Sequence, residues 1–164
     1  MTRWSVRMKR SGAGERESDA GAVGRPNEFV IEDSLGYIVN RVARSMASQL
    51  GEELRPAGVG IGQWAVLMFL WAGDGMSQAE LSRVVAIEPP TMVRTIDRMV
   101  RDGLVRRTPD PGDRRVSRIY LTDRGRSLRD ELVPKALAVN AANLGKLTAG
   151  EVRTLRRLLG KLLP

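Results

Sequence analysis

The 164-residue sequence contains no cysteine and no histidine. Disulfides, thiolate nucleophiles, zinc sites made of cysteine and histidine, and a histidine general base are therefore excluded. Carboxylates are present, but no pair of them lies in a recognisable apolar-cleft pattern, and no phosphate-binding loop or metal-ligand motif occurs. The sequence therefore argues against an enzyme, and it implies no cofactor and no metal site.

Long apolar runs are also absent. The longest, WAVLMFLWA at 64–72, has nine residues, whereas a membrane-spanning helix needs roughly 20. The N-terminal residues MTRWSVRMKR are charged and no apolar segment follows them, so we predict no signal peptide. We expect a cytoplasmic protein with no membrane association, formed by one domain or by one domain with an added oligomerisation element.

Lysine is scarce, and arginine supplies 23 of the 27 basic residues of a chain with a net charge of +8. Basicity of this size indicates nucleic acid, an anionic membrane or an acidic partner. Eight arginines and no lysine lie between positions 101 and 126. Arginine matches phosphates and guanine edges better than lysine does, which favours nucleic acid, although arginine is abundant throughout the chain.

The chain begins with a segment, 1–29, that is rich in Gly, Ser, Arg and Glu and has no apolar period, so we predict a disordered basic tail. Apolar residues then recur at steps of three and four, which indicates a long helix from Asp33 to about 54. The helix predicted at 61–72 is apolar nearly all round and should be buried on several sides. Thr122 should cap a long helix at 123–145.

Two shorter helices are predicted in the middle of the chain. Ser77 and Glu80 form a capping box that starts the first, at 77–85. After the turn AIEPP, paired prolines suit the start of the second, which should stop at Gly103. This is helix-turn-helix spacing, in which the start of the second helix enters the major groove of DNA. The alternative is a plain helical core with solvated arginines.

A β-hairpin should follow the second helix. Strand signals at 104–108 and 116–121 flank the loop PDPGD, in which Pro109, Pro111 and Gly112 fix the turn. Asp113 can hold a neighbouring arginine in a forked pair, and an arginine at the tip can enter the minor groove. Alone, such a hairpin is a solvated tip; directly after a helix-turn-helix, it predicts a winged helix.

The stretch 77–126 resembles the MarR family of bacterial winged-helix regulators. The motifs that carry the resemblance are PPT-x-x-R-x-x-D-R-x-x-x-x-GLV, DP-x-DRR and LT-x-x-GR, and the helical flanks extend it over about 30–163. It implies a mainly α (α+β) fold with a winged helix-turn-helix domain at 61–122 and a helical dimerisation region at 30–60 and 123–164. It also implies a homodimer that binds a pseudo-palindromic operator on double-stranded DNA, mostly as a repressor, at the nucleoid when bound.

Motif and resemblance together define the expected contacts with DNA. Asp113 and Arg115 are the wing pair implied by the resemblance, with Arg114 beside them, and Arg94 and Arg98 are helix contacts. The full predicted set is Ser77, Pro90, Thr91, Val93, Arg94, Thr95, Arg98, Asp113, Arg114 and Arg115. Glu88 stands where the family often has Ser or Thr, and Val93 where it often has a small polar residue, so the base readout stays open.

The resemblance also implies a small-molecule pocket between the dimerisation helices and the winged helix, commonly for aromatic or phenolic anions. The candidate lining residues are Tyr37, Asn40, Arg41, Arg44, Trp64, Met68 and Trp71. The alternative is that the Trp and Met residues are ordinary core. Without Cys or His, this chain cannot use the cysteine-based peroxide sensing or the histidine-based zinc sensing of two subgroups.

A second hypothesis belongs to another class: a winged-helix protein-interaction module without sequence-specific DNA binding. The placement of Arg94, Arg98, Arg114 and Arg115 argues against it. Duplex binding that weakens with salt would separate the two hypotheses, because each phosphate contact steepens the salt dependence.

Overall fold

The computed structural model describes residues 5–7, 28–113 and 115–163, which fall into two compact units that divide between Ser45 and Met46. In the first unit, strands β1 (Ser5–Arg7) and β2 (Glu28–Val30) pair in parallel, and a 3-10 turn, η1 (Ile31–Asp33), follows. Strand β1 and the first two residues of β2 lie in the segment, 1–29, for which a disordered tail is predicted. The remainder of that prediction, up to residue 27, lies outside the described residues.

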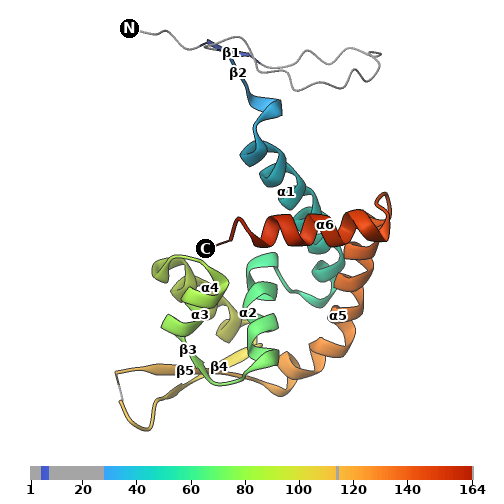
Figure 1. Cartoon of the computed structure of the whole chain (residues 1–164). Coiled ribbons are helices and arrows are strands. Elements are labelled where there is room, and N and C mark those ends of the chain that lie inside the picture. Colours follow the sequence, from blue (N-terminus) through green and yellow to red (C-terminus); the bar gives the residue numbers. More distant parts are fainter. Residues whose placement is uncertain (1–4, 8–27, 114, 164) are drawn as a thin grey trace, which may run out of the picture. The chain divides into compact units, whose positions relative to one another are not determined.

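Helix α1 (Leu35–Leu54) runs through the division between the units. The second unit then continues with η2 (Arg55–Ala57), α2 (Ile61–Ala72), β3 (Met76–Ser77), α3 (Gln78–Val85), α4 (Pro89–Arg101), β4 (Val105–Pro109), β5 (Ser117–Leu121), α5 (Asp123–Leu144) and α6 (Ala149–Gly160). Strands β3, β5 and β4 form a small antiparallel sheet in that order. The mainly helical α+β class predicted from the sequence is confirmed (Figure 1).

The predicted helix ends are confirmed by their hydrogen bonds. Ser77 Oγ accepts from the N–H of Glu80 (3.2 Å), and the N–H of Ser77 donates to the Glu80 carboxylate (2.7 Å). Thr148 and Glu151 form the same box before α6. In each box the backbone N–H of the capping residue is the main cause that lowers the pKa of the glutamate. Gly103 ends α4 with a φ of 67°.

The core of the second unit lies where α2, α4, α5 and the sheet meet. Its largest fully buried side chains include Leu67, Leu70, Ile96, Ile119 and Leu132. Helix α2 is less enclosed than predicted: five of its residues are buried, but Met68 is 48% exposed and Phe69 36%. The apolar character of the sequence did not distinguish the face packed on α3, α4 and α5 from the face that these helices leave uncovered.

Strand β3 was not predicted. It has two residues, paired as Met76 with Ile119 and Ser77 with Arg118. Two residues carry no periodicity, so this pairing depends on contacts with a strand about 40 positions away rather than on a local signal. Among the residues that the structure describes, every helix is too short or too polar to cross a membrane.

Candidate nucleic-acid interface

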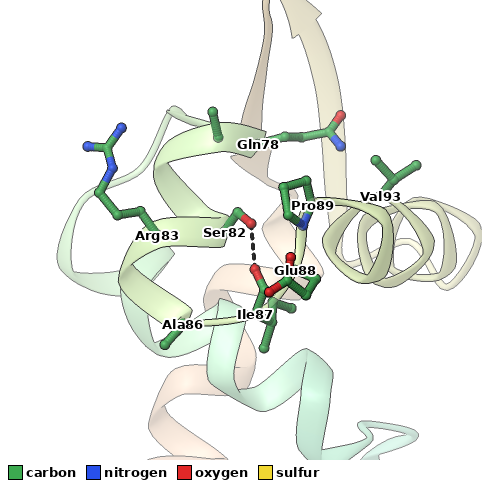
Figure 2. A pocket seen from close by; sticks show the side chains of 9 residues that line it. Gln78, Ser82, Arg83, Ala86, Ile87, Glu88, Pro89 and Val93 are labelled. Carbon is green, nitrogen blue, oxygen red and sulfur yellow. Dashed lines mark hydrogen bonds between the residues drawn. The ribbon is translucent and has the colours of Figure 1, made fainter.

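Helices α3 and α4 form the predicted helix-turn-helix. The turn between them is fixed at Ala86, whose φ of 57° is left-handed, and by the hydroxyl of Ser82, which donates to the carbonyl of Ile87 (2.5 Å; Figure 2). The N–H of Ile87 donates back to the carbonyl of Ser82 (3.1 Å). These bonds fix the angle at which α4 leaves α3.

Helix α4 has one buried face and one exposed face. Met92, Ile96 and Met99 are fully buried. The opposite face exposes Arg94 and Arg98, and neither side chain takes part in a hydrogen bond or ion pair with another described residue. Of the other predicted contacts on α4, Pro90, Thr91 and Val93 are exposed and Thr95 is half-buried. The hydroxyl of Thr95 donates to the carbonyl of Thr91 (2.9 Å).

Ser77 lies apart from this exposed face. It is only 9% exposed, and both its N–H and its hydroxyl bind Glu80 in the capping box. The structure therefore gives Ser77 a role in starting α3. Pro90, Thr91, Val93, Arg94, Thr95 and Arg98 all lie on α4, whereas Asp113 and Arg115 lie in the β4–β5 loop.

The β4–β5 hairpin forms the predicted wing, with Val105 opposite Leu121 and Pro109 opposite Ser117. Asp113 pairs with Arg115, but not through the predicted forked contact: one carboxylate oxygen accepts from both the backbone N–H (3.0 Å) and the Nε (3.2 Å) of Arg115. The Arg115 side chain is 92% exposed. Arg114 lies outside the described residues.

Asp110 also shapes the wing loop, and the sequence analysis did not single it out. Its Oδ1 accepts from the N–H groups of Gly112 (2.7 Å) and Asp113 (3.1 Å). Its other oxygen pairs with Nε of Arg118 on β5. The hydrogen bond from Arg118, followed by those from Gly112 and Asp113, lowers the pKa of Asp110, and Asp110 in turn raises the pKa of Arg118.

Arg118 joins the wing to the helix-turn-helix. Besides Asp110, its Nη1 donates to the carbonyl of Gly75 (3.0 Å) and lies 4.0 Å from the Glu80 carboxylate that caps α3. A second link joins Arg107 on β4 to Asp97 on α4 (2.6 Å). The wing is therefore held at a defined position relative to both helices.

A separate hollow of about 350 Å³ lies between α2 and α5. Trp64 and Trp71 meet edge to face at its wall, with ring centroids 5.5 Å apart. Met68 also lines it, so three of the seven predicted ligand residues are brought together. Tyr37 and Arg41 line a different hollow on α1, and Asn40 and Arg44 line neither. The first hollow also has two polar residues that the sequence analysis missed, Arg129 and Asn140.

Comparisons with known proteins agree with this geometry. Residues 61–117 match the MarR family. The HTH-type transcriptional repressor NicR of Pseudomonas putida is 37% identical over 101 residues, which cover 62% of this chain and 64% of NicR. The HTH-type transcriptional repressor Mb2911 of Mycobacterium bovis is 30% identical over 128 residues, which cover 78% of this chain and 92% of that protein. The chain belongs to the MarR family. It is thus a helix-turn-helix transcriptional regulator, from a family of regulators and not of enzymes.

Solved structures share the fold of this MarR-family chain. A cysteine-to-serine variant of MarR from E. coli, in complex with operator DNA, is 31% identical, covers 79% of this chain and 94% of its own, and has a TM-score of 0.73. CouR from Rhodococcus jostii, bound to p-coumaroyl-CoA, is 23% identical, covers 80% of this chain and 93% of its own, and has a TM-score of 0.70. At that identity the likeness to CouR is one of fold alone.

Proposed function

We propose that this MarR-family regulator is a homodimeric repressor that binds a pseudo-palindromic operator through α4 and the wing. The observation that carries the proposal is the placement of cations: Arg94 and Arg98 are exposed on α4 with no partner among the described residues, and Arg115 is exposed on a wing braced by Arg118. Both relatives named above are repressors, and the E. coli structure contains operator DNA. The protein would act in the cytoplasm, at the nucleoid when bound.

Each predicted contact has a role in this proposal. The start of α4 contacts base edges in the major groove through Pro90, Thr91, Val93, Arg94 and Thr95. Arg98, one turn further along, contacts phosphate. Asp113 aims Arg115 at the minor groove with Arg114 beside it, and Ser77 acts through the cap of α3.

The proposed dimer follows from apolar surface that the single chain leaves exposed. Helix α6 and the residues after it expose Leu155, Leu158, Leu159, Leu162 and Leu163, at 39% to 74%. A contiguous leucine surface of this kind marks an interface, and a two-fold dimer is the commonest way to cover one. In the proposed division, residues 30–60 and 123–164 dimerise and 61–122 bind DNA. Two recognition helices then read half-sites about one helical turn apart.

The test is a selection of random duplex DNA by the purified full-length protein, followed by binding to the enriched site at two salt concentrations. A pseudo-palindromic site is expected, with a log–log salt slope that steepens by roughly 0.9 for each phosphate contacted. Weak binding with no enriched sequence and a flat salt dependence would favour the protein-interaction module instead.

We propose further that a small aromatic or phenolic anion in the hollow between α2 and α5 relieves repression. Trp64 and Trp71 supply aromatic walls, and Arg129 supplies a cation for an acidic group. The hollow connects to α4 through hydrogen bonds. The indole N–H of Trp71 donates to the carbonyl of Gly125 (2.9 Å). The Thr122 hydroxyl, which accepts from the N–H of Gly125, donates to the carbonyl of Gly103 at the end of α4 (2.6 Å) and also lies near that of Leu104 (3.1 Å). A ligand that displaces Trp71 therefore disturbs the start of α5 and the end of α4 together.

A titration of aromatic carboxylates and phenols, monitored by tryptophan fluorescence and operator binding, tests the ligand site. A ligand should change the fluorescence and weaken operator binding. In Arg129→Gln, operator affinity without ligand should be unchanged and the response to acidic ligands should weaken. An unaltered response in this variant would rule out Arg129 as the anchor.

A further inference from the structure

The start of α4 is poorly suited to hold a phosphate. A helix N-terminus binds phosphate through its unpaired backbone N–H groups. Here the first two residues are Pro89 and Pro90, which have no N–H. The next two N–H groups, of Thr91 and Met92, both donate to the carbonyl of Glu88, at 2.9 Å and 3.0 Å. The first turn of α4 therefore offers no free amide to the DNA backbone.

The residue at the cap of α4 is an acid, Glu88. It is exposed, it makes no side-chain capping bond, and its carboxylate has no hydrogen bond or ion pair with another described residue. A carboxylate repels phosphate. The favourable partner for it on DNA is a hydrogen-bond donor, and in the major groove such donors belong to the exocyclic amino groups of cytosine and adenine.

The chemistry of Glu88 and of its neighbours on α4 favours cytosine over adenine. A hollow of about 520 Å³ lies between α3 and α4. Glu88 lines its α4 side with the apolar Pro89 and Val93, and the polar residues Gln78, Ser82 and Arg83 line its α3 side (Figure 2). In adenine, the amino group stands beside the N7 acceptor, which a carboxylate repels. In cytosine, the N4 amino group stands beside the C5 position, an apolar edge that suits Pro89 and Val93. Thymine and guanine present acceptors to the same place.

We propose that Glu88 accepts a hydrogen bond from the N4 amino group of one cytosine in each operator half-site and so determines specificity at that base pair. This inference rests on the proposed operator binding. It identifies the base that the hollow reads, and it gives a function to an exposed acid that has no partner among the described residues.

The first experiment repeats the selection of random duplex DNA with four proteins: wild type, Glu88→Gln, Glu88→Ala and, as the matched control, Glu53→Gln on the exposed end of α1. One position of the wild-type half-site should be enriched in cytosine. In Glu88→Gln that position should shift to adenine, because glutamine pairs with adenine N6 and N7. In Glu88→Ala it should lose its preference while the other positions keep theirs, and Glu53→Gln should match the wild type.

The second experiment uses the wild-type protein and changes the DNA instead. Replacing the selected cytosine by thymine should weaken binding by about tenfold, within the usual range for discrimination against a wrong base. Replacing it by 5-methylcytosine should change binding less than about twofold, because N4 is retained and Val93 and Pro89 accept a methyl group. The thymine penalty should disappear in Glu88→Ala.

The outcomes separate this inference from the function on which it rests. A wild-type protein that enriches no sequence overturns both. A defined half-site whose preferences are the same in wild type and Glu88→Ala overturns only the role of Glu88. Thymine bound as well as cytosine, or better, also overturns it and assigns the position to the methyl contact with Val93.

Discussion

The Arg115→Ala variant tests the proposed contact of the wing with DNA, because it should leave the folding of the wing nearly unchanged. The Arg115 side chain is 92% exposed, and Asp113 is its one partner among the described residues. Loss of such an exposed pair costs folding less than about 1 kcal/mol. Loss of a specific arginine interaction with DNA costs about 1–3 kcal/mol. Operator affinity should therefore fall roughly 5- to 150-fold for each wing contact that is lost, with almost no change in thermal stability.

The assay is a titration of the selected operator, with the melting temperature and oligomeric state of each variant measured in parallel. Arg55→Ala is the matched control, because it removes an equal charge from an exposed turn away from the wing. Asp113→Ala should give an intermediate loss, since Arg115 keeps its charge but loses its anchor. Unchanged affinity in Arg115→Ala, or a loss no larger than that of Arg55→Ala, would refute the argument that the wing contacts DNA.

Three further predictions concern the contact of α4 with DNA, the packing at the start of α5 and the anchoring of the wing loop. Arg98→Ala should reduce the salt slope by about 0.9 for each phosphate that the arginine binds, with base preference unchanged, as measured by operator binding at several salt concentrations. Gly125→Ala should lower the melting temperature by several degrees, because the added Cβ would lie 2.1 Å from the backbone oxygen of Leu104 and such overpacking costs about 1–3 kcal/mol. The pKa of Asp110 is lowered in the fold. The stabilisation by its Arg118 pair is therefore complete above the ordinary aspartate pKa of about 3.9 and is lost as pH falls through the lower folded value. After correction for the intrinsic exchange rate, the protection of the wing amides from hydrogen exchange should stay constant from about pH 5 to 8, whereas Asp110→Asn should reduce it at neutral pH.

The features that could be predicted from the sequence are those determined by neighbouring residues. A capping box needs only Ser77 and Glu80, three positions apart, and a helix that ends at a left-handed residue needs only Gly103. The contact between Asp113 and Arg115 likewise spans only two positions, although it is not the forked pair that was predicted. In each case the atoms that bond belong to the same turn, so the rest of the fold adds little to their geometry.

The features that could not be predicted depend on strand register. Asp110 and Arg118 meet because Pro109 pairs with Ser117, which places the acid and the arginine diagonally across the hairpin. A shift of one residue would turn Arg118 to the other face of the sheet. The bond from Arg118 to Gly75 depends in addition on β3, which has no sequence pattern. The hollow that contains Arg129 could be anticipated only in part because it depends on how α2 lies against α5, which is far from it in the sequence.

Most of the arginines between 101 and 126 have partners within the protein, so their number does not measure how many contact DNA. Three of the eight arginines pair with acids elsewhere in the fold: Arg107, Arg118 and Arg126. A fourth, Arg124, donates to the carbonyl of Asp102, and a fifth, Arg106, lies over the ring of Tyr120 at 4.9 Å. Their guanidinium groups link strands and helices, so part of their hydrogen-bonding capacity is used within the fold. Within the part of the chain that the structure describes, the cations best placed for DNA are instead the unpaired Arg94 and Arg98, outside that cluster, and the tip residue Arg115. The salt slope of operator binding should therefore follow these few exposed arginines rather than the arginine count of the sequence.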